Sequence, residues 1–245
     1  MNFSNPSEQQ LNSLIKLYQN RQYNDAEKLS LSITEEFPKH LFAWKVLGAI
    51  LKQKGRISES LIACQKSVQL DPQDAKAHNN LAIILLLQSR LEEAETSLRQ
   101  AIKLKPDLAE AHNNLGIIFQ KHRKFTEACS AYIQAINFNP DFTDAYENLG
   151  MVIKKVRFNS SNVELYPLLI RLLSIGNFVR PRDLASSILS LLKHDPLIKN
   201  LLLEKNFATS PKEINSVIGS LDKLTLLHHL MRICPLPDLQ FEKFF

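Results

Sequence analysis

Side-chain amides recur along this chain at a constant spacing. Asn80, Asn114 and Asn148 lie 34 residues apart, and Asn79 and Asn113 directly precede the first two of them. A primary amide carries both a donor and an acceptor, so it can pair with the N–H and C=O of a peptide group of any sequence. Asparagine also costs about 0.7 kcal/mol against alanine inside a helix, so its repetition needs an explanation. The series predicts a surface that holds an extended peptide; the alternative is that these amides bond to adjacent helices or helix ends within the protein.

Basic residues form a second pattern. They come in three clusters, which are Lys52, Lys54 and Arg56, then Lys121, Arg123 and Lys124, then Lys154, Lys155 and Arg157. We expect these clusters to lie at helix turns along one edge of the fold, where they could attract an acidic or phosphorylated partner at low salt. The alternative is that they are simply solvated. The chain as a whole has 30 Lys and Arg against 25 Asp and Glu, an excess too small to favour nucleic acid as a partner.

Residue patterns typical of enzymes are missing from the sequence, which has no nucleophile elbow, Walker loop, dinucleotide fingerprint or His-Glu-x-x-His motif. His78 and His112 stand where other copies of the repeat have Trp44 and Tyr146, so we expect them to fill packing positions. The three cysteines lie far apart, which predicts neither a disulfide framework nor a zinc site. We therefore expect a non-enzyme that needs no metal and no cofactor.

The asparagines, the basic clusters and the two histidines all belong to an internal repeat of 34 residues. The repeat is marked by Pro38, Pro72, Pro106 and Pro140, and by Leu47, Leu81, Leu115 and Leu149, each leucine being followed by Gly or Ala. Each copy predicts two amphipathic helices closed by a proline, such as 75–89 and 91–104. The copies span about 8–40, 41–74, 75–108 and 109–142, with a partial copy over 143–158. A single hairpin cannot bury its apolar face, so the copies must stack.

The period disappears after residue 158, where a different helical region begins. Prolines interrupt this region, and Leu184, Ile188, Leu191 and Leu192 share one helix face. An open stack of hairpins needs its last apolar face covered. Residues 159–245 are therefore predicted to be an irregular helical cap on the repeats or the start of a further region, and homo-oligomerisation through them stays open.

The repeats resemble the tetratricopeptide repeat (TPR) family. One copy carries the family's pattern as Trp44, Leu47, Gly48, Leu51, Ser60, Cys64, Ser67 and Pro72. The asparagine series is similar to the ladder in the repeats of O-linked N-acetylglucosamine transferases, and residues 224–245 weakly resemble segments of bacterial TPR-containing transferases. The resemblance implies an all-α solenoid of helix hairpins, a right-handed superhelix, followed by the irregular helical region.

The resemblance also implies that the A helices line a concave groove. It adds Lys45, Ile83, Ile117 and Met151 to the asparagines as groove residues. Chaperone-binding members use a two-carboxylate clamp, but Ala49, Glu110 and Asn114 stand at places where this clamp has other residues, which disfavours recognition of a C-terminal carboxylate.

These observations favour a non-catalytic protein–protein interaction scaffold that binds an extended peptide segment. The alternative is an N-terminal, substrate-recruiting module of a larger transferase, a glycosyltransferase or a methyltransferase, whose catalytic domain is absent from this chain. The most apolar run, 81–87, is too short to span a membrane. We therefore expect a soluble, cytoplasmic protein with a protein or peptide partner and no membrane partner.

Overall fold

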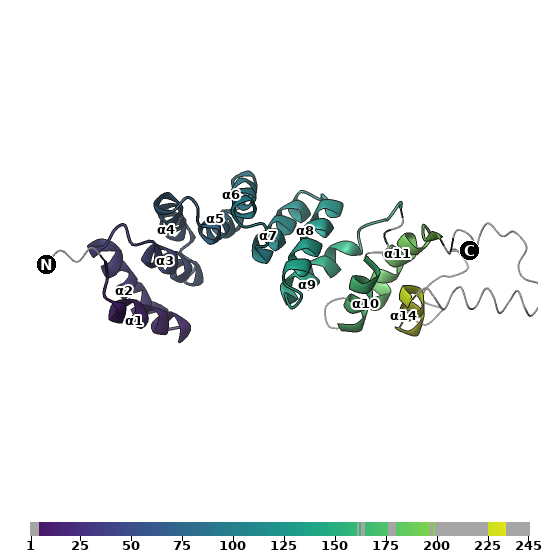
Figure 1. The fold of residues 1–245 in the computed structure, drawn as a ribbon, viewed down its shortest axis with the longest axis horizontal. Coiled ribbons are helices and arrows are strands. Elements are labelled where there is room, and N and C mark those ends of the chain that lie inside the picture. The colour runs from purple at the N-terminus through teal and green to yellow at the C-terminus, as the bar shows by residue number, and fades with distance from the viewer. Residues whose placement is uncertain are drawn as a thin grey trace, which may run out of the picture. The chain divides into compact units, whose positions relative to one another are not determined.

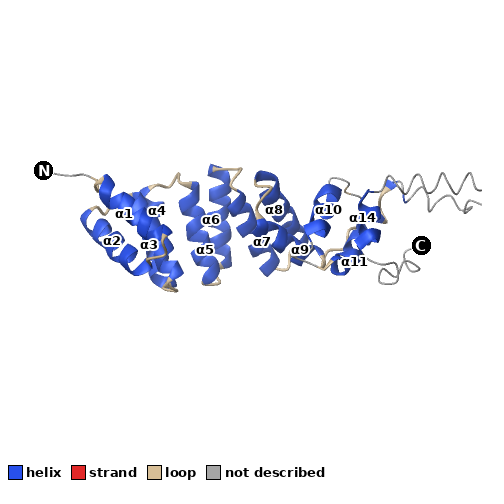
Figure 2. Cartoon of the chain, turned by 90° about the horizontal axis from the view of Figure 1, so that it is seen from below, coloured by secondary structure: helices blue, strands red, loops and turns tan. Residues whose placement is uncertain are grey.

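The computed structural model describes residues 5–160, 162, 165–175, 180–196, 198 and 225–233. Within these residues all regular secondary structure is helical, as Figure 2 shows. The chain divides into two compact units. The N-terminal unit comprises residues 1–122 with 137–140, and the C-terminal unit comprises residues 123–136 with 141–245. The all-α fold of consecutive helix hairpins expected from the sequence is confirmed.

The N-terminal unit is a series of helix hairpins (Figure 1). Its helices are α1 (Glu8–Gln19), α2 (Tyr23–Glu36), α3 (Leu41–Gln53), α4 (Ile57–Leu70), α5 (Ala75–Leu87), α6 (Leu91–Leu104) and α7 (Ala109–Lys121). Each helix packs against the next, and α3, α5 and α7 also contact one another in turn. We call α3, α5 and α7 the A helices of their repeats, and α4 and α6 the B helices.

The turn between the two helices of a hairpin uses a left-handed backbone conformation. It recurs every 34 residues, at Arg21 (φ 58°), Gly55 (φ 73°), Ser89 (φ 59°) and Arg123 (φ 59°). Glycine adopts this conformation freely, whereas other residues adopt it at a cost in conformational free energy. The conformation at Ser89 also explains why α5 ends at Leu87, two residues earlier than the sequence predicts.

Small residues let the two helices of a hairpin approach closely. A Cβ added to Gly48 of α3 would lie 3.0 Å from Sγ of Cys64 on α4, which is tighter than ordinary contact. Ser60 of α4 donates a hydrogen bond of 2.7 Å to the backbone oxygen of Gly48. The next hairpin uses Ala82 and Ala94, both fully buried. The small positions of the repeat are therefore set by helix packing.

A side chain near the start of each A helix bonds back to the proline that follows the preceding helix. Trp44 Nε1 donates to the Pro38 carbonyl oxygen at 2.9 Å. His78 Nε2 lies 3.0 Å from the oxygen of Pro72, and His112 Nε2 lies 2.8 Å from that of Pro106. The two histidines thus form the same link as the tryptophan, which adds a hydrogen bond to the packing role expected for them.

The C-terminal unit contains most of α8 (Phe125–Phe138), together with α9 (Thr143–Ile153), α10 (Tyr166–Ile175), α11 (Pro181–Leu192) and α14 (Thr225–Ile233). Helix α11 contacts α9, and α14 contacts both α10 and α11. The guanidinium of Arg171 lies 4.9 Å from the ring centroid of Tyr146. The four residues predicted to share a face of α11 are all buried.

One polar contact joins the predicted C-terminal region to the repeats, and a second lies within that region. The backbone N–H of Phe158 donates to Ser190 Oγ at 3.0 Å, and the Tyr166 hydroxyl donates to Asp195 at 2.5 Å. These contacts hold residues after 158 in the same unit as α9. Residues 199–224 and 234–245, which belong to the predicted cap, lie outside the described part of the chain.

Candidate functional site

Two members of the asparagine series bond to each other. The Nδ2 of Asn114 on α7 donates to Oδ1 of Asn79 on α5 at 2.9 Å. Asn79 is only 7% exposed and Asn113 only 5%. A buried amide needs a partner inside the protein, and for Asn79 the neighbouring repeat supplies it. For Asn79 and Asn114 the structure therefore favours the alternative interpretation, in which the amides join adjacent A helices.

Asn80 differs from these two residues because it is half-buried and faces a hollow between α3, α4 and α5. The hollow is lined by Gly48, Ala49, Lys52, Cys64, Asn80, Ile83 and Ile84, and it contains about 240 Å³ of space that includes open solvent. Within the described chain the Asn80 amide makes no hydrogen bond. Its donor and acceptor are therefore available to a ligand.

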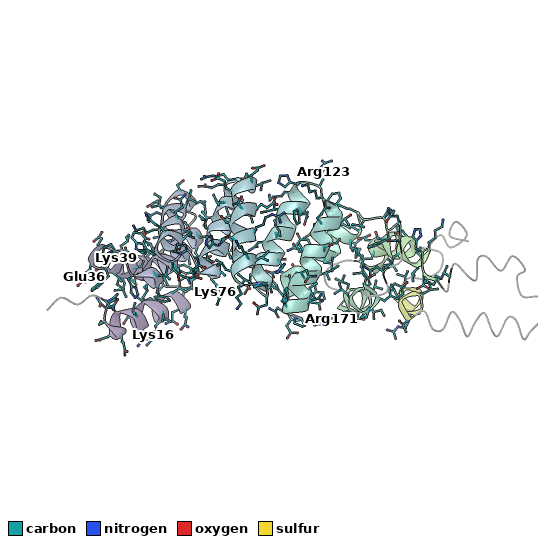
Figure 3. The ribbon with its side chains drawn as sticks, turned by 45° about the horizontal axis from the view of Figure 1, so that its top comes forward. Lys16, Glu36, Lys39, Lys76, Arg123 and Arg171 are labelled. Atoms are coloured by element: carbon teal, nitrogen blue, oxygen red, sulfur yellow. The ribbon has the colours of Figure 1, made fainter. Side chains whose placement is uncertain are left out.

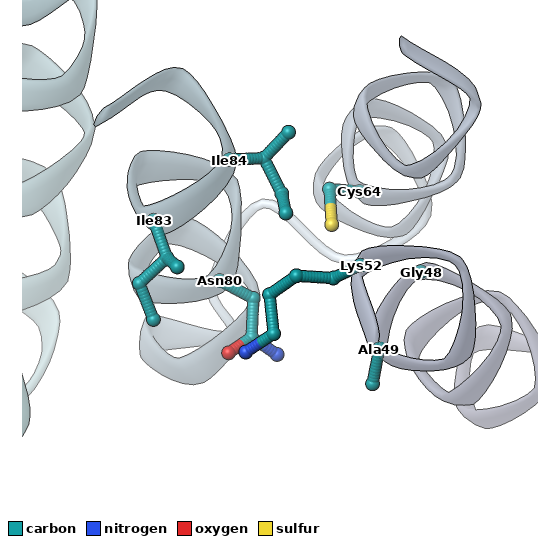
Figure 4. Close-up of a pocket in the computed structure, with 7 residues that line it drawn as sticks. All are labelled: Gly48, Ala49, Lys52, Cys64, Asn80, Ile83 and Ile84. Carbon is teal, nitrogen blue, oxygen red and sulfur yellow. The ribbon is translucent and has the colours of Figure 1, made fainter. Parts of the chain in front are cut away.

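Lys52 reaches the same hollow from α3. Figure 4 shows the Lys52 and Asn80 side chains turned to the same side of it, with Ala49 and Ile83 flanking them. From its place in a basic cluster, we expected Lys52 to lie on a basic edge. The structure instead puts it beside a predicted peptide-binding asparagine, because it lies in the last turn of α3 on the side of α5. Sequence spacing alone did not reveal this pair.

Lys45, a predicted groove residue, is held by an ion pair. Its Nζ lies 2.5 Å from Oδ2 of Asp74. Asp74 caps α5 by accepting hydrogen bonds from the backbone N–H of Lys76 and Ala77. Burial disfavours the charged form of Asp74, but the Lys45 hydrogen bond and charge and the two N–H donors outweigh it and hold the Asp74 pKa below its usual value. Lys45 therefore fastens α3 to the start of α5.

Apolar side chains extend the surface next to Asn80. Ile83 on α5 and Ile117 on α7, both predicted groove residues, are half-buried. Leu87, which the sequence reasoning missed, is 56% exposed. It follows Asn80 by seven residues and Ile83 by four, a helical spacing that could have identified it. We use the name binding face for the predicted binding surface formed by Lys52, Asn80, Ile83, Leu87 and Ile117.

Two further predicted groove residues belong to the C-terminal unit. Asn148 on α9 is half-buried and has an interaction within the protein. Met151, on the same helix, is 42% exposed. The peptide-binding roles of Asn148 and Met151 remain predictions.

In the N-terminal unit, two residues of the predicted basic edge bind a buried carboxylate. Lys54 Nζ lies 2.5 Å from Glu27 Oε2, and Arg56 forms ion pairs with both Glu27 and Glu59. The hydrogen bond from Lys54 is the largest cause that lowers the Glu27 pKa, and Arg56 adds to it against the opposing effect of burial. These two cations therefore join α2 to the α3–α4 hairpin, and Lys121, at the end of α7, stays exposed.

In the C-terminal unit the basic residues also divide into two groups. Lys155 Nζ lies 5.1 Å from the ring centroid of Phe125, and Arg157 donates to Ser187 Oγ at 3.3 Å. Arg123, Lys124 and Lys154 are exposed, and Figure 3 labels Arg123 where it projects from the ribbon. Several residues of the predicted basic edge therefore contact other residues within their own unit.

The buried thiols are poor nucleophiles. Burial raises the pKa of Cys64 to about 11 and that of Cys129 to about 12, so both stay protonated at neutral pH. Across the residues that the structure describes, no three His, Cys, Asp or Glu side chains gather as a metal site would require. None of the helices described is both long and apolar enough to span a bilayer.

Family models match the repeats. A model described as "TPR repeat" matches residues 84–122, and two models described as "Tetratricopeptide repeat" match 63–96 and, for the second, both 43–74 and 109–142. These matches together lie within residues 43–142, and the models describe repeats only. No curated protein matches the sequence.

Solved structures of similar fold include PilF of Pseudomonas aeruginosa, with a TM-score of 0.60 at 16% identity over 96% of each chain. YrrB, described as a TPR protein with an unusual peptide-binding site, has a TM-score of 0.54 at 17% identity over 71% of this chain and 88% of its own. A MamA structure has a TM-score of 0.53 at 18% identity over 82% of this chain and 96% of its own. At these identities the likeness concerns the fold.

Proposed function

We propose that the tetratricopeptide repeats within residues 43–142 make this chain a protein-interaction scaffold whose binding face holds an extended peptide segment. One observation carries the proposal. The Asn80 amide and the Lys52 ammonium line one solvent-open hollow, and within the described residues neither has a hydrogen-bond partner. Exposed or half-buried apolar side chains continue the face along α5 and onto α7. Polar groups set in a concave apolar surface are typical of ligand sites.

The geometry of the repeats suits an extended ligand. Successive A helices lie roughly 10 Å apart, and an extended peptide advances about 3.3 Å per residue, so each repeat meets about every third residue. A net hydrogen bond contributes about 1 kcal/mol, and burial of an aliphatic side chain about 1.5 to 3 kcal/mol. A few such contacts give affinities of roughly micromolar strength after the cost of ordering the peptide.

The fold likeness to YrrB supports this proposal, because that protein is described as having a peptide-binding site. The comparisons lend no support to the alternative of a transferase module, since the matching family models describe repeats only. A scaffold role needs no catalytic group. It needs a surface that stays in place while a partner binds, and the packed hairpins supply that surface.

A selection from random 12-residue peptides displayed on phage, with the full chain as bait, tests the proposal. Synthetic versions of the selected peptides are then measured by fluorescence anisotropy. Asn80→Ala should weaken binding about fivefold, since it removes one or two hydrogen bonds. Asn12→Ala, a matched change on the exposed surface of α1, should leave affinity unchanged.

Both variants should unfold at the wild-type temperature, because neither side chain has a hydrogen-bond partner among the residues that the structure describes. The proposal fails if no peptide is enriched over an unrelated bait. It also fails if selected peptides bind Asn80→Ala as tightly as they bind the wild type.

A further inference from the structure

We propose that the hollow beside Lys52 and Asn80 receives an acidic side chain, an aspartate or glutamate within the bound segment rather than its C-terminal carboxylate. This inference rests on the proposed function, because it requires a peptide on the binding face. It adds the chemical class that the face selects.

The first argument is the unpaired charge of Lys52. The two cations that follow Lys52 in sequence are paired within the protein, since Lys54 binds Glu27 and Arg56 binds both Glu27 and Glu59. Lys52 is half-buried and forms no salt bridge with any described carboxylate. An ammonium group that is partly withdrawn from water interacts more strongly with an anion than a fully exposed one does. The positive charge of Lys52 therefore favours an anionic group of the ligand in the hollow.

The second argument is the donor set. The Lys52 ammonium and the Asn80 amide both supply N–H donors to the hollow, and a carboxylate accepts two such bonds at once. The oxygen of the Asn80 amide remains for a backbone N–H of the peptide. A dianionic phosphate would call for a second cation or an arginine fork, and the described lining offers one lysine. A carboxylate fits this set better.

The third argument is the wall of the hollow. Gly48, Ala49, Cys64 and Ile84 line it, and they bring no competing charge because the buried thiol stays protonated. An apolar wall lowers the local dielectric and strengthens a charge-assisted hydrogen bond.

The apolar part of the binding face determines which type of residue the ligand carries near its acidic residue. Ile83 and Leu87 lie on α5 beyond Asn80, and Ile117 is the counterpart of Ile83 one repeat further on. A step of roughly 10 Å corresponds to about three extended residues. The preferred ligand therefore carries an acidic residue with an aliphatic residue about three positions away.

The sequence logo of the phage selection tests this preference. With the wild-type chain, Asp or Glu should be enriched together with Ile, Leu or Val about three positions away. Lys52→Glu should lose the acidic preference and favour Lys or Arg at that position. Lys103→Glu, which makes the same change of charge at an exposed site on α6, should keep the wild-type preference.

Affinities of one selected peptide complete the test. Replacing its acidic residue by the matching amide, Asp by Asn or Glu by Gln, should weaken binding about tenfold. Lys52→Met, which keeps the aliphatic stem and the fold, should weaken binding to a similar degree. The two changes together should cost little more than either one alone, because they remove the same interaction. Amidation of the peptide's C-terminus should leave affinity unchanged.

The outcomes separate this inference from the proposed function. If no peptide is selected, both the inference and the proposed function are contradicted. If peptides are selected without an acidic residue, or bind Lys52→Met as tightly as wild type, the inference is overturned while the scaffold function stands. If amidation abolishes binding, the bound group is the terminal carboxylate and the inference is again overturned.

Discussion

The side-chain amide of Asn114 donates a hydrogen bond to the side-chain oxygen of Asn79, across two neighbouring repeats and over 2.9 Å. This contact divides the asparagine series into two kinds of residue. One kind joins A helices to each other, while Asn80 faces a hollow and its amide has no hydrogen-bond partner among the described residues. The asparagine series looks uniform in the sequence, but in the structure it contains both residues that join helices and a residue that faces the hollow.

Asn114→Ala should destabilise the fold by about 1 to 2 kcal/mol, because it leaves the buried Asn79 oxygen without this donor. Asn80→Ala should change stability by less than about 0.5 kcal/mol. Urea denaturation followed by circular dichroism measures both. Equal stabilities for the two variants would mean that the Asn79–Asn114 contact contributes nothing.

His78 and His112 should carry their proton on Nε2 when the ring is neutral, because each Nε2 faces a proline carbonyl oxygen that can only accept. Long-range ¹H–¹⁵N correlation spectra distinguish the two tautomers of each ring. Observation of the Nδ1–H tautomer at either position would rule out the link between that A helix and the preceding proline.

Gly55→Ala should cost about 1 kcal/mol, since alanine resists the left-handed conformation at φ 73°. The cost is purely conformational, because no atom lies within 4 Å of an added Cβ. Ser89→Gly, at the matching turn of the next repeat, should instead stabilise the fold by up to about 1 kcal/mol. Thermal unfolding of both variants measures these shifts, and a change of the same sign in both would contradict the turn geometry.

Glu27→Gln should destabilise the fold by about 1 kcal/mol at pH 7, because a neutral amide binds Lys54 and Arg56 more weakly. The folded-state pKa of Glu27 lies below its ordinary value of 4.5, with the Lys54 hydrogen bond as the largest cause. The stabilisation is therefore complete above about pH 4.5 and is lost as pH falls through the lower, folded-state pKa. Denaturation curves at several pH values should show the difference between wild type and variant shrinking in acid. A difference that stays constant down to pH 2 would exclude the charge of Glu27 as its origin.

Much of the fold follows from the sequence because the repeat constrains it at many points. Proline closes each B helix, glycine or alanine follows the leucine of each A helix, and the 34-residue step carries these features along the chain. The helix hairpins and the burial of the α11 face could be predicted in this way. The early end of α5 could not be predicted, because serine is not a residue type that indicates the left-handed conformation found at Ser89.

The site could be predicted only in part. Periodicity picks out positions on a helix but does not tell which amide has a partner in the next repeat, so Asn79 and Asn80 looked alike. Lys52 was assigned to the basic clusters because its neighbours in sequence are basic, although its side chain reaches the hollow beside Asn80. Such pairings depend on contacts between repeats, and a single copy of the repeat does not contain them.

The side-chain resonances of Asn80 test the central claim most directly. The ¹H–¹⁵N spectrum of the full chain is recorded while a selected 12-residue peptide is added, with Asn80→Ala used to assign its NH₂ signals. The Asn80 signals should shift in a saturable way, and those of Asn79, which is buried behind the face, should move far less. Saturable peptide binding that leaves the Asn80 signals unmoved would contradict the account.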